Sequence, residues 1–168
     1  AALALALRNS GLKVCALEAR PAKAASNDAR ALALSYGSRL LLARLGVWNT
    51  LRDVSAIRII HISQQQSFGR TLLNASELEV PELGYVLPYS ALQDALTGAL
   101  QHSEVVSIYG ASVTWLKNSD DHAVIGYQQD GSEHTLHAHL AVVADGGKLL
   151  EQQYPPRVHD YGQSALVT

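Results

Sequence analysis

The sequence predicts an α/β fold with a βαβ core, an inserted β-hairpin and a β-meander. Three observations support this prediction. The first 18 residues follow the order helix, glycine, apolar strand and acid, which is the second half of a βαβ unit. Two further segments carry apolar residues at helical spacing. Short strand-like stretches separated by turn residues then fill most of the last third of the chain.

The N-terminal segment indicates a nucleotide-binding edge. Residues 1–8 are an Ala/Leu run of high helix propensity, and Gly11 can end the helix in a left-handed conformation. The apolar stretch 13–18 then ends in Glu18. In dinucleotide-binding βαβ units an acid at this place accepts hydrogen bonds from ribose hydroxyls. Glu18 is therefore a candidate ligand, and a buried crossover with an incidental acid is the alternative.

The glycine-rich loop of such a unit would lie immediately before Ala1. We therefore expect the chain to form part of a dinucleotide-binding domain, with the N-terminal strand and the glycine loop missing. The lack of any methionine agrees with a chain that starts inside an element.

Two more helices are expected. Ser35 is predicted to cap a helix over residues 36–45, which Gly46 ends. Ser90 is predicted to cap another helix that runs to residue 100. The residues expected on the apolar faces of these two helices are Leu40, Leu41, Leu45 and, more weakly, Ala43 in the first and Leu92, Ala95, Leu96 and Ala99 in the second.

Strands account for most of the remaining chain. A hairpin is expected from residues 56–63 and 68–73 around Gln64-Gln65-Gln66, and a short strand at 105–108. A meander is expected from residues 112–116, 122–128 and 133–137. The apolar run 140–144 is predicted to be a buried strand that ends in Asp145-Gly146-Gly147. Open α/β sheets bind ligands outside such strand ends, so this is a second candidate edge.

Composition excludes several classes. The chain has 168 residues, is 48% hydrophobic and carries a net charge of −2, which fits one globular domain and gives no basic face for nucleic acid. Cys15, the single cysteine, lies in an apolar strand, which predicts a buried thiol in a reducing, cytoplasmic location. No apolar stretch reaches the length of a membrane span, so any membrane contact is expected to be peripheral.

Other chemistries find little support in the residues. His134, His137 and His139 lack an evident fourth ligand, so we expect no metal site. The serines and histidines show no nucleophile-elbow motif, so we do not expect hydrolase chemistry. We assign no catalytic side chain.

Three stretches resemble the FAD-dependent aromatic hydroxylases of the para-hydroxybenzoate hydroxylase type. The resemblance is greatest to their ubiquinone-biosynthesis branch, the 2-octaprenyl-6-methoxyphenol hydroxylase type. The stretches are LKVCALEAR, DARALALSYGSRLLLARLGVW and LAVVADGG, and the closing YGQSALVT also resembles this branch. Their order and spacing match over nearly the whole chain. The resemblance implies that residues 1–168 are a partial FAD/NAD(P)-binding domain of Rossmann-like fold, without the family's upstream glycine-rich loop and downstream Gly-Asp motif.

The resemblance also implies which residues bind the cofactor. Glu18 would bind the adenosine ribose of FAD, Arg30 would approach the flavin or pyrophosphate, and Gln93 would reach the phosphates. The full set of cofactor-binding residues is Glu18, Arg20, Arg30, Gln93, Asp145 and Gly146. Asp145 and Gly146 match a motif associated with FAD and the nicotinamide donor. The family usually continues with Ser and then Arg, where this chain has Leu149 and Gln152.

The activity implied is that of an FAD-dependent, NAD(P)H-using monooxygenase that hydroxylates a prenylated phenol in ubiquinone biosynthesis. The cofactor would supply the chemistry, and the protein would bind, orient and exclude water. A lipid-tailed substrate adds the expectation of peripheral contact at the inner membrane. The alternatives are a flavin-dependent reductase of the same fold and a non-catalytic nucleotide-binding module. Oligomeric state is not indicated.

Overall fold

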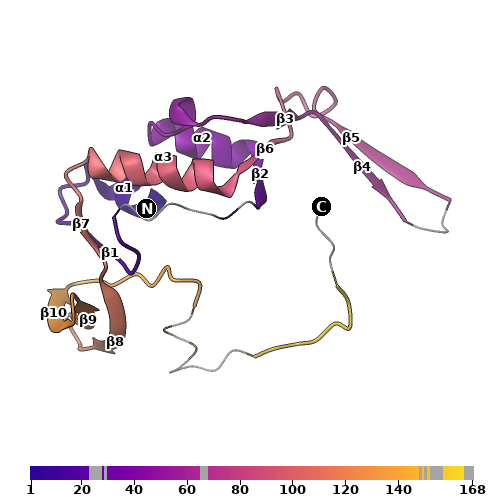
Figure 1. Ribbon diagram of the computed structural model, residues 1–168. Helices are drawn as coiled ribbons and strands as arrows, with labels where there is room; N and C mark the ends of the chain where they lie inside the picture. The colour runs from indigo at the N-terminus through magenta and orange to yellow at the C-terminus, as the bar shows by residue number, and fades with distance from the viewer. Residues whose placement is uncertain are drawn as a thin grey trace. The chain divides into compact units, whose positions relative to one another are not determined.

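The computed structural model describes most of the chain. The described residues are 1–22, 28, 30–64, 68–147, 149, 151 and 157–164. Their contacts define two units, the first made of Ala1–Ala16 and Ala22–Ile108 and the second of Leu17–Pro21 and Tyr109–Thr168. Figure 1 labels the helices and strands of both units.

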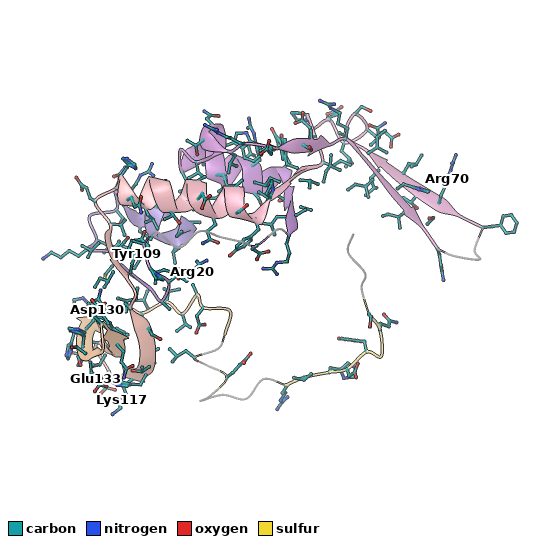
Figure 2. All side chains as sticks on the ribbon, viewed as in Figure 1. Arg20, Arg70, Tyr109, Lys117, Asp130 and Glu133 are labelled. Atoms are coloured by element: carbon teal, nitrogen blue, oxygen red, sulfur yellow. The ribbon has the colours of Figure 1, made fainter. Side chains whose placement is uncertain are left out.

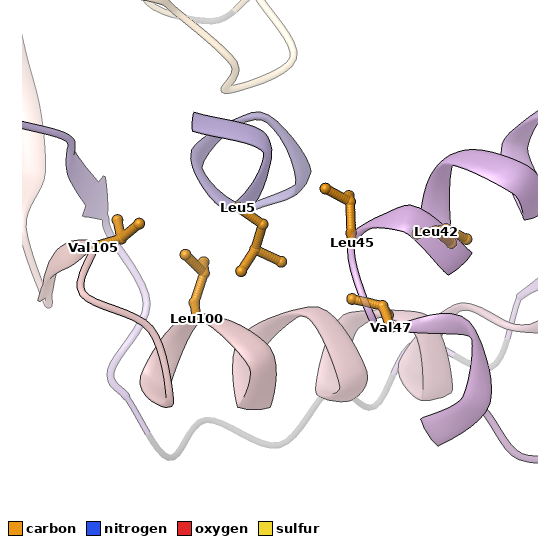
Figure 3. Packing of buried hydrophobic residues seen from close by; sticks show 6 residues of the cluster. All are labelled: Leu5, Leu42, Leu45, Val47, Leu100 and Val105. Atoms are coloured by element: carbon orange, nitrogen blue, oxygen red, sulfur yellow. The ribbon is translucent and has the colours of Figure 1, made fainter. Parts of the chain in front are cut away.

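The core of the first unit lies among its helices. α1 (Ala2–Leu7), α2 (Tyr36–Arg44) and α3 (Tyr89–Gln101) each supply one buried leucine. Figure 3 shows how these leucines meet the neighbouring apolar side chains; the cluster is Leu5, Leu42, Leu45, Val47, Leu100 and Val105. Burying one such side chain stabilises a fold by about 1.5–3 kcal/mol. This cluster therefore holds the three helices together.

The predicted start and end of α2 are confirmed, and so is the burial of Leu45, but the placing of Leu40, Leu41 and Ala43 on its apolar face is wrong. The Ser38 backbone N–H donates to Ser35 Oγ at 3.1 Å, and Gly46 has φ +79°. Leu40 and Leu41 are exposed, whereas Leu42 is buried. The cause is the turn after the helix, because Leu45, Val47 and η1 (Trp48–Thr50) fold back and select the face that carries Leu42.

α3 begins two residues earlier than predicted, and the predicted cap is wrong. Its N-cap is Pro88, which makes no side-chain capping bond, so Ser90 lies inside the first turn. The Tyr89 N–H donates instead to the Arg30 carbonyl oxygen at 2.9 Å. The predicted apolar face of this helix is confirmed, since Leu92, Ala95, Leu96 and Ala99 pack against the core cluster.

β2 (Ala31–Ser35) and β6 (Gly84–Pro88), which lead directly into α2 and α3, belong to a three-stranded antiparallel sheet. Its strand order is β2, β6 and β3 (Ser55–Ile57). Neither β2 nor β6 is predicted from the sequence. A Cβ at Gly84 would overlap the Leu34 carbonyl oxygen, so only glycine allows this close approach of the two strands.

The predicted hairpin is confirmed over residues 59–63 and 70–73, whereas residues 56 and 57, predicted in its first strand, belong to β3 and pair with β6. β4 (Ile59–Ser63) pairs antiparallel with β5 (Arg70–Asn74), with Ile60 opposite Leu73. Residues 65–67 of its connection lie outside the described residues. Large apolar side chains of this hairpin are exposed on both faces, namely Ile59, Ile60, Ile62, Leu72 and Leu73.

β1 (Cys15–Glu18) and β7 (Val106–Tyr109) form a two-stranded sheet. The Val106 N–H donates to the Val14 carbonyl oxygen and the Ala111 N–H to that of Glu18, so the strands run in the same direction. This is the parallel pairing that a βαβ core requires. Cys15 is exposed, so the prediction of a buried thiol is wrong. Its strand has only β7 as a partner among the described residues, which leaves this side chain uncovered.

The second unit contains the predicted meander, which is confirmed. β8 (Ser112–Asn118), β9 (Ala123–Gln129) and β10 (Ser132–Ala138) pair antiparallel in the order β10, β9, β8. Asp130 and Gly131 make the tight turn with φ values of 50° and 77°. The Trp115 ring lies across Gly126, where any Cβ would overlap it.

The predicted strand at residues 140–144 is wrong. These residues form no strand, and Leu140 and Val142 are 79% and 59% exposed. An apolar run becomes a buried strand only where neighbouring strands satisfy its backbone, and no described strand pairs with it.

The predicted fold class is confirmed. Helices and strands form a mixed α/β structure with the βαβ pairing, the hairpin and the meander all present. None of the helices in the described residues is long and apolar enough to span a membrane.

Candidate functional site

Glu18 and Arg20 form a pair at the end of β1. Arg20 Nε donates to Glu18 Oε1 at 2.9 Å, and its Nη2 donates to Oε2 at 3.2 Å. The Arg20 backbone N–H also donates to Oε1, at 3.1 Å. The Glu18 carbonyl oxygen accepts the backbone N–H of Ala111, and the Arg20 carbonyl oxygen accepts that of Gly110. Figure 2 labels Arg20 together with Tyr109, the last residue of β7.

This pair keeps Glu18 ionised. The side-chain hydrogen bond from Arg20 is the main reason that the pKa of Glu18 lies below its ordinary value, and partial burial acts in the opposite direction. A carboxylate has about four lone-pair positions. Arg20 and its backbone use only part of them, so Glu18 can still accept hydrogen bonds from the hydroxyls of a ribose.

Arg30 lies just before β2 and is held in a similar way by Asp28. Its backbone N–H and its Nε donate to Asp28 Oδ1 at 3.1 and 2.9 Å. Its guanidinium also lies over the Tyr89 ring, with Cζ 5.5 Å from the ring centroid. The Asp28 hydrogen bonds lower the pKa of that carboxyl and raise the pKa of Arg30. Both groups therefore stay charged at neutral pH.

Gln93 lies on α3, one helical turn after Tyr89. Its Oε1 is buried and has no hydrogen-bond partner among the described residues. A buried amide oxygen without a partner is costly in a folded protein. The side chain therefore has an unused polar group, and rotation of the amide can present either its oxygen or its NH₂ to a ligand.

Asp145 and Gly146 form a turn in the second unit. Asp145 Oδ1 accepts the Gly147 N–H and Oδ2 accepts the Leu149 N–H, both at 2.8 Å. Gly146 has φ +79°, a conformation in which glycine lets a backbone approach a ligand closely. Leu149 therefore contacts the Asp-Gly turn through its backbone. Gln152 lies outside the described residues.

Of the six predicted residues, the structure joins Glu18 directly to Arg20. It also links Arg30 to Tyr89, on the helix that carries Gln93. Asp145 accepts hydrogen bonds from the Gly147 and Leu149 backbone N–H groups of its own turn.

Two residues that sequence reasoning missed are Asp28 and Tyr89, which hold Arg30. A signal for Asp28 exists in the sequence. An acid two residues before an arginine occurs in both Glu18-Ala19-Arg20 and Asp28-Ala29-Arg30.

Other candidate sites are less well formed. Within the part of the chain that the structure describes, no three His, Cys, Asp or Glu side chains are placed to hold a metal ion. Two open depressions of about 250 and 330 Å³ are present, and none of the six predicted residues lines them.

The residues present fit FAD. Glu18 provides an ionised acceptor suited to ribose hydroxyls, and Arg30 provides a cation whose guanidinium can pair with phosphate oxygens. Gln93 provides a buried amide oxygen that has no partner among the described residues, and rotation of the amide would present its NH₂ group there. These are the donor and acceptor types with which a protein binds the ribose hydroxyls and phosphate oxygens of a dinucleotide.

Known proteins are similar to this chain. A protein of Synechocystis sp., slr1300, is 30% identical over 87% of the chain. The 3-demethoxyubiquinol 3-hydroxylase of Escherichia coli is 32% identical over 99% of it. The chain spans only 36% and 44% of the lengths of these two relatives. The solved structure of CabE, an aromatic hydroxylase from angucycline biosynthesis, has a TM-score of 0.75 at 20% identity. It matches 90% of this chain and 30% of its own.

The family profile described as FAD binding domain matches residues 1–164. The match agrees with the resemblance to FAD-dependent aromatic hydroxylases and with FAD as the cofactor, and both predictions are confirmed. Since it covers nearly the whole chain, the protein belongs to the family of FAD binding domains.

Proposed function

We propose that this protein is an FAD-dependent monooxygenase that uses NAD(P)H to hydroxylate a prenylated phenol in ubiquinone biosynthesis. The observation that carries the proposal is the 32% identity with the 3-demethoxyubiquinol 3-hydroxylase of Escherichia coli over 99% of the chain. Because the chain spans 44% of that relative, the activity is proposed for the full-length protein.

Bound FAD, reduced by NAD(P)H, would supply the oxygen-activating chemistry. The side chains of this protein would bind and orient it. Glu18, kept ionised by Arg20, would accept hydrogen bonds from the adenosine ribose. Arg30 would donate to phosphate oxygens. The NH₂ group of Gln93 would do the same after rotation of its amide, whose buried Oε1 has no partner among the described residues.

Asp145 and Gly146 would contribute through their backbone. The Asp145 carboxylate accepts two N–H groups of its own turn, which holds Gly146 in its left-handed conformation. A glycine in this conformation has no side chain to block a cofactor, so the turn would lie against FAD or the nicotinamide donor.

The test uses full-length protein, NADH or NADPH, a prenylated phenol and isotopically labelled oxygen gas. Mass analysis of the product should show one labelled oxygen atom, and little reductant should be consumed without the phenol. Unlabelled product, or reductant oxidation that responds to no phenol, would instead favour a flavin-dependent reductase. Protein purified without flavin, and unable to bind it, would favour a nucleotide-binding module of another kind.

The proposal extends to location. A prenylated phenol partitions into lipid, so a cytoplasmic enzyme acting on it would need peripheral contact with the inner membrane. Cell fractionation, followed by flotation with vesicles that contain the prenylated phenol, tests this. Recovery of the protein only in the soluble fraction, with and without substrate, would contradict the membrane contact.

A further inference from the structure

Asp28 and Arg30 are joined through three separate donors of the arginine. The Arg30 backbone N–H donates to Asp28 Oδ1 at 3.1 Å. Its Nε lies 2.9 and 3.0 Å from Oδ1 and Oδ2, and its Nη2 donates to Oδ2. Because one carboxylate receives both backbone and side-chain donors, it fixes the chain direction at Arg30 as well as the plane of the guanidinium.

Tyr89 supplies a second restraint on Arg30. The Arg30 carbonyl oxygen accepts the Tyr89 N–H at 2.9 Å, next to the β2–β6 pair in which Ala31 lies opposite Pro88. The guanidinium Cζ lies 5.5 Å from the Tyr89 ring centroid. The guanidinium is thus held along one edge by a carboxylate and on one face by an aromatic ring.

The remaining edge of Arg30 is accessible. The Asp28 bonds use Nε and Nη2, and Nη1 has no hydrogen-bond partner among the described residues. The Arg30 side chain is 75% exposed, whereas that of Asp28 is 27% exposed. An arginine loses rotamer freedom when a ligand fixes it. Because Asp28 and Tyr89 already restrict the Arg30 side chain, little conformational entropy is lost when a ligand binds. Preorganisation of this kind raises affinity.

We propose that Asp28 is a positioning residue that orients Arg30 toward the phosphate oxygens of bound FAD. This inference rests on the proposed function. Asp28 has two opposing effects, because its negative charge also weakens the attraction of Arg30 for an anion. If orientation dominates, removing the carboxylate weakens FAD binding. If charge dominates, removing it strengthens binding, so the sign of the effect decides.

The experiment measures FAD affinity of the full-length protein by flavin fluorescence quenching. Asp28→Ala should raise the dissociation constant about fivefold, and Asp28→Asn should raise it less, since the amide oxygen keeps part of the bonding. In an Arg30→Ala background, Asp28→Ala should have almost no further effect, because the residue acts through Arg30. Asp120→Ala, which removes a carboxylate from an exposed turn, is the matched control.

The outcomes separate the inference from the proposed function. Wild-type protein that fails to bind FAD overturns both. If the wild type binds FAD and Asp28→Ala binds it as tightly or more tightly, the inference alone is overturned. The inference is also overturned if Asp28→Ala weakens FAD binding equally in the wild-type and the Arg30→Ala backgrounds. Thermal unfolding of the flavin-free variants reports folding. If Asp28→Ala does not fold, Asp28→Asn decides. An FAD affinity of Asp28→Asn that lies between those of the wild type and Arg30→Ala supports the positioning role, and an FAD affinity equal to that of the wild type overturns it.

Discussion

Arg20 engages both carboxylate oxygens of Glu18, with Nε 2.9 Å from Oε1 and Nη2 3.2 Å from Oε2. The same arrangement, an arginine two residues after its acid, joins Arg30 to Asp28. In both pairs the arginine backbone N–H donates to the same carboxylate. The acid two residues before each arginine therefore restrains the direction of the guanidinium and keeps both groups charged.

Glu18→Ala should weaken FAD binding by the full-length protein. Loss of charge-assisted hydrogen bonds to the ribose costs about 1.5–3 kcal/mol, which is about 10- to 150-fold in the dissociation constant. Fluorescence titration with FAD measures it. Glu77→Ala, which removes an exposed acid from the turn after β5, should bind as wild type does. Equal affinities of the two variants would contradict the role of Glu18.

Glu18 should also make folding stability depend on pH. Its folded pKa is lowered by Arg20 from the ordinary value of 4.5. A lowered folded pKa gives stability that is fully present above the unfolded value and is lost as pH falls through the folded value. Urea unfolding should therefore show wild type more stable than Glu18→Gln at about pH 7, with the difference shrinking at about pH 3. A difference that stays constant over this range would exclude the Arg20 interaction as its source.

Gln93→Leu should change stability and binding in opposite directions. The buried Oε1 has no partner among the described residues, so an apolar side chain of similar size should stabilise the flavin-free protein by about 1 kcal/mol. FAD affinity should fall about fivefold, because the amide that would meet the cofactor is gone. Gln101→Leu, at the exposed end of α3, is the control for added apolar surface. Unchanged FAD affinity in Gln93→Leu would remove Gln93 from the site.

Two glycines should respond oppositely to alanine. Gly98 lies inside α3 with no atom near an added Cβ, so Gly98→Ala should stabilise the protein by about 0.5–1 kcal/mol. At Gly84 the Cβ would overlap the Leu34 carbonyl oxygen, so Gly84→Ala should destabilise it by about 1–3 kcal/mol. Thermal unfolding compares the two. Equal effects would mean that β2 and β6 are not packed this closely.

Local signals predicted the elements that local interactions define. The Ser35 cap and Gly46 set the ends of α2, and Asp130-Gly131 set the turn of the meander. In each of these places the residues that decide the conformation lie within a few positions of one another. The carboxylate of Glu18 at a strand end was readable for the same reason.

Elements that depend on distant partners were not predictable in this way. β2 and β6 pair across more than one intervening element, and their short apolar sequences carry no period that separates them from loops. Residues 140–144 have the composition of a buried strand but find no partner among the described residues. Asp28 escaped notice because its role appears only when the Arg30 side chain is seen folded back on it.

The exposed hairpin of β4 and β5 has a practical consequence for handling this chain. Ile59, Ile60 and Ile62 form a β-prone, uncharged and proline-free stretch, and neither strand has a second neighbour in the described structure. Such an edge is a template for intermolecular pairing. Concentrated solutions of the 168-residue chain should therefore aggregate through this stretch. A lysine at Ile62 would act as a gatekeeper and keep the protein dispersed.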